Sequence, residues 1–188
     1  MHTRFGRGLA RGFSLIEVLV AVLVLAVGIV GAGAAQVTAL KTRHGTGLLS
    51  SGVQLAGSLA ERMRANPVQM RAGDAANPYL QAQFDADGGA PAVPGVLCYA
   101  PANCTSAQMA AFDIYEVKQA LHQQYPGARL VVCRDRAVWD ARAAALAWAC
   151  AGGAEAPVVI KIGWRGRKTE GEGGFAPAVA VVVGGAFE

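Results

Sequence analysis

The fold of this chain is decided by one stretch near its N-terminus, Arg11-Gly12-Phe13-Ser14-Leu15-Ile16-Glu17-Val18-Leu19-Val20. Every residue from 18 to 35 is apolar or glycine, and a run of this length is a candidate for a membrane-spanning helix. One carboxylate, Glu17, lies at its edge, five positions after Gly12. Because a charged side chain is costly in lipid, an acid in this position indicates a function.

Two simpler explanations cover only part of the pattern. A secretory signal peptide accounts for the basic residues Arg4, Arg7 and Arg11 and for the small residues 32–34, but its apolar core is shorter and contains no glutamate. A plain signal anchor accounts for the length of the apolar run and leaves Glu17 unexplained.

The whole pattern resembles the class III signal of type IV prepilins. That resemblance implies that a prepilin peptidase removes residues 1–12 as a leader by cutting between Gly12 and Phe13, and that the new N-terminus at Phe13 is methylated. Glu17 becomes the fifth residue of the mature chain, where pilins and the pseudopilins of type II secretion carry glutamate. The resemblance implies that Glu17 pairs with the charged N-terminus of a neighbouring subunit.

Within the type IV pilin superfamily the resemblance is strongest to minor pilins of the type IV pilus modification kind, PilV. It is carried by the segments 12–21, 60–67 (Ala60-Glu-Arg-Met-Arg-Ala-Asn-Pro67), 125–127, 131–135 and 160–164. It implies a minor pilin that helps to prime pilus assembly near the tip. The implied partners are the prepilin peptidase, other minor pilins, the major pilin, a tip adhesin and the inner membrane.

Composition fits one small domain with one membrane segment, since the chain has 188 residues and is 53% hydrophobic. The formal net charge is +4, but residues 1–12 hold three arginines and no acid. The remainder has 14 Lys and Arg against 13 Asp and Glu, a net charge of +1. A charge this small gives no argument for nucleic-acid binding.

The leader arginines predict the orientation of the chain, because Lys and Arg beside a membrane segment stay in the cytoplasm. Everything after about residue 36 is then exported. We expect a single-pass protein of the bacterial inner membrane, with its head in the periplasm, that later joins a pilus fibre at the cell surface.

Four cysteines lie in the exported part, where disulfides persist. Three pairings are possible, and short loops close at lower entropic cost, which favours Cys98 with Cys104 and Cys133 with Cys150. The spacing contains no C-x2-C pair and no nearby histidine, so we expect neither a metal site nor a cofactor.

One helix is predicted from Phe13 to Ala65, roughly 80 Å long at 1.5 Å per residue, so half of it projects beyond a bilayer. Asn66-Pro67 ends it. Its projecting half has an apolar stripe of Leu48, Leu55, Leu59 and Met63, which needs a sheet to cover it. We expect a solvated face for Arg43, Glu61, Arg62 and Arg64.

The remaining chain predicts a loop-rich region over 68–104, in which Asp85, Asp87 and Gly88 form a turn rather than a calcium site. A capping box at 105–108 begins a second helix, with an apolar stripe that ends at Tyr125. Strands are expected at 129–133, 158–164 and 178–183, with a hairpin loop at 165–174. The segment 139–149 is compatible with either helix or loop.

These elements predict an α+β fold, a long N-terminal helix packed on a small antiparallel sheet, as the pilin resemblance also implies. The expected divisions are a leader (1–12), a transmembrane assembly half of the helix (13–36), a projecting half (37–66) and a globular head with disulfides (67–188).

No catalytic pattern is present: the sequence has no paired nucleophile and base, no G-x-S-x-G and no phosphate-binding loop, so we expect a structural protein and no enzyme. Two alternatives to the minor pilin remain. One is a minor pseudopilin of a type II secretion system, which has the same leader and glutamate. The other is a DNA-uptake pilin that contacts phosphate through Arg165, Arg167 and Lys168.

Overall fold

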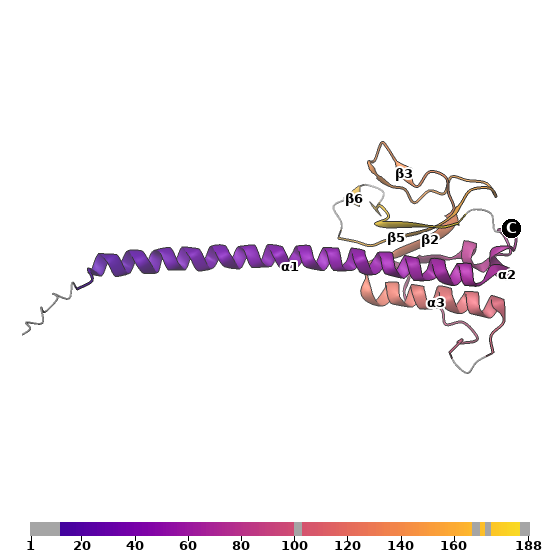
Figure 1. Ribbon diagram of the computed structural model, residues 1–188, viewed down its shortest axis with the longest axis horizontal. Helices are drawn as coiled ribbons and strands as arrows, with labels where there is room; N and C mark the ends of the chain where they lie inside the picture. Colours follow the sequence, from indigo (N-terminus) through magenta and orange to yellow (C-terminus); the bar gives the residue numbers. More distant parts are fainter. Residues whose placement is uncertain (1–11, 100–102, 167–169, 172–173, 185–188) are drawn as a thin grey trace, which may run out of the picture. The chain divides into compact units, whose positions relative to one another are not determined.

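The computed structural model describes residues 12–99, 103–166, 170–171 and 174–184. The chain forms two compact units, Met1–Thr46 and Gly47–Glu188. Helix α1, Leu15–Ala65, contributes to both (Figure 1). It ends where the sequence predicts, because Asn66 precedes a proline and leaves the helical region at φ −114°, ψ 64°.

The elements that follow α1 belong to the second unit. In chain order they are α2 Pro67–Met70, η1 Pro78–Gln81, β1 Gln83–Asp85, η2 Ala86–Gly88, α3 Ser106–Gln124, β2 Arg129–Arg134, β3 Trp139–Asp140, β4 Ala145–Leu146, β5 Val158–Gly163, β6 Glu170–Gly171, β7 Gly174–Phe175 and β8 Val179–Gly184.

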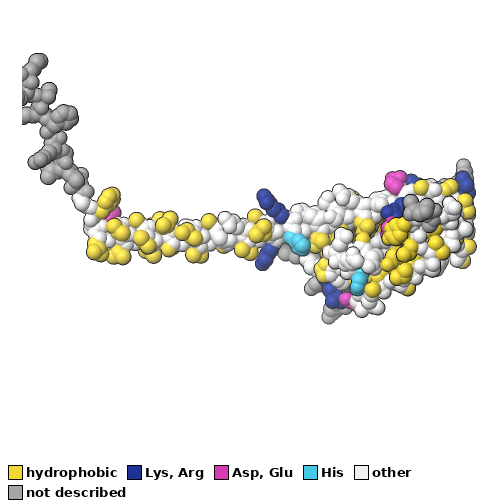
Figure 2. Space-filling model, turned by 90° about the horizontal axis from the view of Figure 1, so that it is seen from below, with side chains coloured by type: hydrophobic (Ala, Val, Ile, Leu, Met, Phe, Trp, Pro, Cys, Tyr) yellow, Lys and Arg dark blue, Asp and Glu magenta, His cyan; other side chains and the backbone are white. Residues whose placement is uncertain are grey.

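In the first unit every described side chain is exposed, and hydrophobic side chains cover the helix (Figure 2). An 18-residue window of α1 has a mean hydropathy of 2.8, so the helix is long and apolar enough to cross a membrane. The apolar run predicted from the sequence is therefore a helical surface that no other described residue covers.

The main sheet is antiparallel, with strand order β1-β2-β5-β8. The three predicted strands are present as β2, β5 and β8, with ends shifted by one residue. Strand β1 corrects the prediction of a loop over 68–104. It was missed because an edge strand of three residues, with only Phe84 half-buried, is too short to show an alternating pattern.

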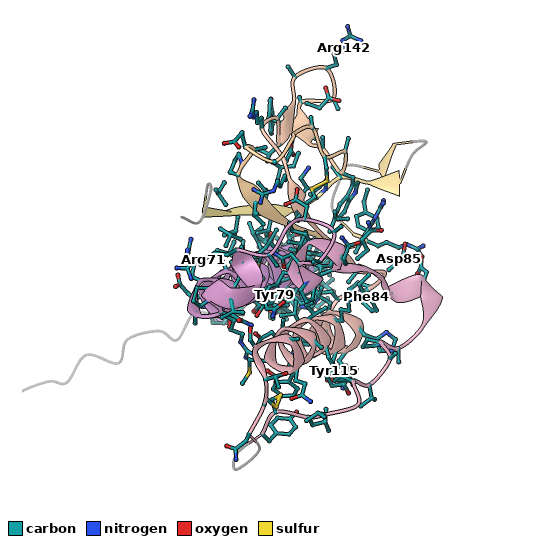
Figure 3. All side chains as sticks on the ribbon, turned by 90° about the vertical axis from the view of Figure 1, so that its right-hand side faces the viewer. Arg71, Tyr79, Phe84, Asp85, Tyr115 and Arg142 are labelled. Atoms are coloured by element: carbon teal, nitrogen blue, oxygen red, sulfur yellow. A yellow bond between two sulfur atoms is a disulfide. The ribbon has the colours of Figure 1, made fainter. Side chains whose placement is uncertain are left out.

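The core of the second unit lies between the sheet and two helices. The last part of α1 and α3 lie on one side of the sheet (Figures 1 and 3). The predicted α1 stripe is confirmed, since Leu59 and Met63 are fully buried. Gly52 also belongs to this face, because a Cβ there would lie 3.0 Å from the Trp164 ring. The buried side chains of the sheet that face the helices are Leu130, Val132, Val158, Ile160, Ile162, Val179 and Val183.

The opposite face of the sheet is covered by residues 136–151, which we call the strap. The segment left open between helix and loop is a hairpin here, because β3 pairs with β4. A disulfide between Cys133 and Cys150 joins the strap to β2, and a second disulfide joins Cys98 to Cys104. These are the pairs that loop length favours.

Lys161 is the buried charge beneath the strap. Its side chain is inaccessible to solvent, its Nζ lies 2.6 Å from Asp135 Oδ2, and it donates to the carbonyl groups of Ala147 and Ala149. Burial alone would raise the pKa of Asp135, but hydrogen bonds from Lys161 and from two backbone N–H groups lower it. The carboxylate therefore stabilises the fold above the unfolded-state pKa, about 4, and this contribution is lost as the pH falls through the lower folded-state pKa.

We predict that Lys161→Met destabilises the second unit by about 3–5 kcal/mol, because Asp135 is left buried without its cation. The loss of stability should shrink as the pH falls, since burial then raises the pKa of Asp135 and the buried carboxyl becomes neutral once it is protonated. Tryptophan fluorescence during denaturant titrations at neutral and acid pH measures both effects. Lys41→Met, at an exposed lysine, is the matched control and should change neither.

Candidate functional site

The stretch that carries the prepilin resemblance opens helix α1. Gly12, Phe13 and Ser14 precede the helix, and the Ser14 carbonyl accepts the backbone N–H groups of Glu17 and Val18 at 3.0 and 3.3 Å. Glu17 therefore lies in the first turn, where a carboxylate interacts favourably with the helix dipole.

The bond between Gly12 and Phe13 is accessible. Phe13 is 82% exposed, and nothing lies within 4 Å of a Cβ added at Gly12. Packing among the described residues thus places no demand for glycine at position 12.

Phe13, just before the helix, lies on the same side as Glu17. With Val18, Ala21, Val22 and Leu25 they line a shallow groove of about 460 Å³. Apart from the Glu17 carboxylate, all of these side chains are apolar. Among the described residues, no side chain bonds to that carboxylate. The groove therefore offers an unpaired anion within an apolar surface, and a cation from a second molecule would satisfy it.

The segment 60–67, which also carries part of the resemblance, connects the end of α1 to the rest of the second unit. Arg62 was predicted on a solvated face, and its side chain is 39% exposed, but it also forms ion pairs with Asp113, at 3.1 Å, and Glu116, both on α3. Arg64 is also engaged, since it donates to the carbonyl groups of Val183 and Val182 on β8. Sequence spacing along one helix gives no sign of such partners on other elements.

Asn66, the residue after α1, adds hydrogen bonds to these contacts between α1 and the other elements. Its side chain donates to the Ser106 carbonyl at 2.8 Å and to Tyr79 Oη at 3.3 Å. The Tyr79 hydroxyl donates to Asp113 Oδ2 at 2.7 Å. Burial and then this hydrogen bond raise the pKa of Tyr79, so the phenol stays protonated and remains a donor. The role of these residues is structural, because they hold α1, η1 and α3 together.

Other candidate sites have ordinary explanations. Asp85 caps the turn at 85–88 by accepting the Asp87 N–H, which confirms a turn at this position. In the part of the chain that the structure describes, no group of three or more His, Cys, Asp or Glu could hold a metal ion. Of the basic residues of the DNA-uptake hypothesis, Arg165 forms an ion pair with Asp87, whereas Arg167 and Lys168 lie outside the described residues.

We predict that Tyr79→Phe lowers the free energy of unfolding by about 1–2 kcal/mol, because the buried Asp113 loses a hydrogen-bond donor. Urea denaturation of the full chain in detergent measures this change. Tyr99→Phe is the control, since Tyr99 is 57% exposed. Equal stability of the two variants would contradict a structural role for the Tyr79 hydroxyl.

Comparisons with known proteins agree with this geometry. A family model described as the prokaryotic N-terminal methylation motif matches residues 7–33, and one described as Tt1218-like, type IV pilin Tt1218, matches residues 34–115. No curated protein and no solved structure matches the chain. The two matches adjoin along the sequence, and the long apolar helix with a small antiparallel sheet is consistent with a type IV pilin fold. Together they support the assignment of this chain to the type IV pilin superfamily.

Proposed function

We propose that this chain is a minor pilin of the PilV kind, cleaved after Gly12, methylated at Phe13 and assembled with other minor pilins into the priming or tip complex of a type IV pilus. The observation that carries the proposal is the exposed groove in which Glu17 lies unpaired beside Phe13. In this proposal the chain is no enzyme and is itself the substrate of a membrane peptidase and methyltransferase.

Cleavage would create the partner that Glu17 lacks. Before cleavage the nitrogen of Phe13 is an uncharged amide, and after cleavage it is a cationic amine. When two subunits stack with an axial offset, the amine of one can pair with the carboxylate of the other. A pair in lipid costs far less than an isolated carboxylate, so assembly becomes favourable only for processed subunits.

Location and partners follow from the same proposal. The apolar part of α1 holds the subunit in the inner membrane, with its N-terminus in the cytoplasm and its head in the periplasm, until it enters a fibre. The major pilin and the other minor pilins are the partners of the apolar helix surface. A tip adhesin would be a partner of the head.

The segment 60–67 and the two disulfides favour a pilus over a secretion pseudopilus, which shares the N-terminal features. Within that segment Arg62 and Asn66 form the ion pairs and hydrogen bonds that hold α3 and η1 against α1. A DNA-uptake role has less support, because Arg165 is neutralised by Asp87. Genes for other prepilin-like proteins beside the gene for this chain would support the pilus.

We predict that Gly12→Leu blocks processing, because the peptidase must hold the chain closely at the cleaved bond. Intact-mass spectrometry of the membrane protein should then find residues 1–12 still attached and no methyl group on Phe13. Gly45→Leu is the control, since position 45 is also exposed and has open space around it. Normal processing of the Gly12→Leu protein would rule out this cleavage site.

We also predict that Glu17→Val leaves processing intact and lowers incorporation into sheared fibres at least about tenfold, because the intersubunit ion pair is lost. Immunoblots of sheared and membrane fractions measure the ratio. Glu155→Val, at an exposed glutamate of the head, should incorporate normally. Normal incorporation of the Glu17→Val protein would contradict the pairing mechanism.

A further inference from the structure

The tip of the strap carries an exposed tryptophan that is followed by two charged residues. Trp139 on β3 is 57% exposed, and Asp140 and Arg142 next to it are also exposed. Among the described residues Arg142 has no side-chain partner. Figure 3 shows Arg142 at the outer end of the β3–β4 hairpin. Exposed tryptophan and arginine are the residue types that contribute most to protein interfaces.

The hairpin is held rigidly. Asp140 Oδ1 accepts the N–H groups of Arg142 and Ala143, and Ala144 completes the turn with a left-handed φ of 48°. Near the end of the strap, the Cys133–Cys150 disulfide and the hydrogen bonds from Lys161 to the Ala147 and Ala149 carbonyls hold it against the sheet. A tip that is ordered before binding loses little conformational entropy on binding, which favours an interaction surface.

A groove on another part of the same unit has matching features. It has a volume of about 550 Å³ and lies between β1, α3 and the loop at 88–94. Phe84, Tyr115 and several prolines line it, and these are surfaces on which an indole ring can stack. Two charged side chains also line it, Asp85 and Lys118.

The tip and the groove each carry one positive and one negative side chain, so each charge on one surface has an opposite charge on the other. The tip offers the cation Arg142 and the anion Asp140, and the groove offers the anion Asp85 and the cation Lys118. Burial lowers the pKa of Lys118, because it disfavours the charged form. A carboxylate beside the amine would favour that charged form.

Tip and groove cannot meet within one chain. Figure 3 shows Arg142 at the outer end of the strap, away from Phe84 and Asp85 on the edge strand β1 and from Tyr115 on α3. A contact between them therefore joins two molecules through different surfaces, which is the kind of interface that can repeat along an open assembly.

We propose that the β3–β4 tip of one copy of this chain docks into the β1–α3 groove of a second copy. Trp139 stacks between Phe84, Tyr115 and the prolines, Arg142 pairs with Asp85, and Asp140 pairs with Lys118. This contact concerns the heads alone and is independent of any pairing by Glu17.

Disulfide trapping in cells tests this contact with the full chain. One tagged copy carries Arg142→Cys and a second, differently tagged copy carries Asp85→Cys, and the oxidised mixed dimer is quantified on non-reducing gels. We expect a mixed dimer whose yield falls about tenfold when Trp139→Ala is added to the first copy. Val68→Cys in place of Arg142→Cys is the matched control, because Val68 is 64% exposed and lies on α2, and it should give only background.

Two further variants separate docking from folding and from membrane association. Mass spectrometry should find both native disulfides intact in Trp139→Ala, and charge reversal by Arg142→Asp should be rescued in trans by Asp85→Arg when association is measured by copurification. Glu17→Val in both copies should leave the mixed dimer unchanged, whatever its effect on fibres. A yield insensitive to Trp139→Ala, a yield lost only with Glu17→Val, or trapping of a different protein in place of the second copy would overturn the proposal.

Discussion

Burial of one face of α1 between Gly52 and Met63 is the interaction on which the second unit depends. Small residues on this face, Gly52, Ala56 and Ala60, let the sheet and α3 approach the helix closely, and Leu59 and Met63 fill the space between them. The polar network of Arg62, Asn66, Tyr79 and Asp113 forms at the end of the same contact. Without the helix face the sheet would expose its own apolar side.

The first unit has the opposite property, because the same helix offers an apolar surface that none of the described residues covers. A lipid bilayer can cover it, and so can the helices of neighbouring subunits. The only charge on this surface between residues 13 and 40 is Glu17. A featureless apolar helix could pack against its neighbours at any height, whereas one charge that needs a partner selects an axial position.

Much of this arrangement was predictable from the sequence, for reasons that differ between residues. The end of α1, the three longer strands and the capping box of α3 depend on local rules, and these rules operate within a few residues. Strand β1, the partners of Arg62 and the burial of Lys161 depend on residues distant in sequence. Alternation along β5 puts the Lys161 side chain opposite the apolar face, but a single strand cannot show that the strap covers it. The same difference separates the two functional surfaces. Gly12, Phe13 and Glu17 form a local sequence pattern, whereas the tip and the groove are formed only when the head folds.

The Cys133–Cys150 disulfide has a consequence for when the head completes its fold. It closes the strap over Lys161, whose counter-ion and carbonyl partners come from the strap and the residue just before it. In a reducing compartment that closure is absent, and a buried lysine without a closed strap is unfavourable. The oxidation of one thiol pair is thus coupled to the completion of the head, because the closed strap provides the carbonyl partners of the buried lysine.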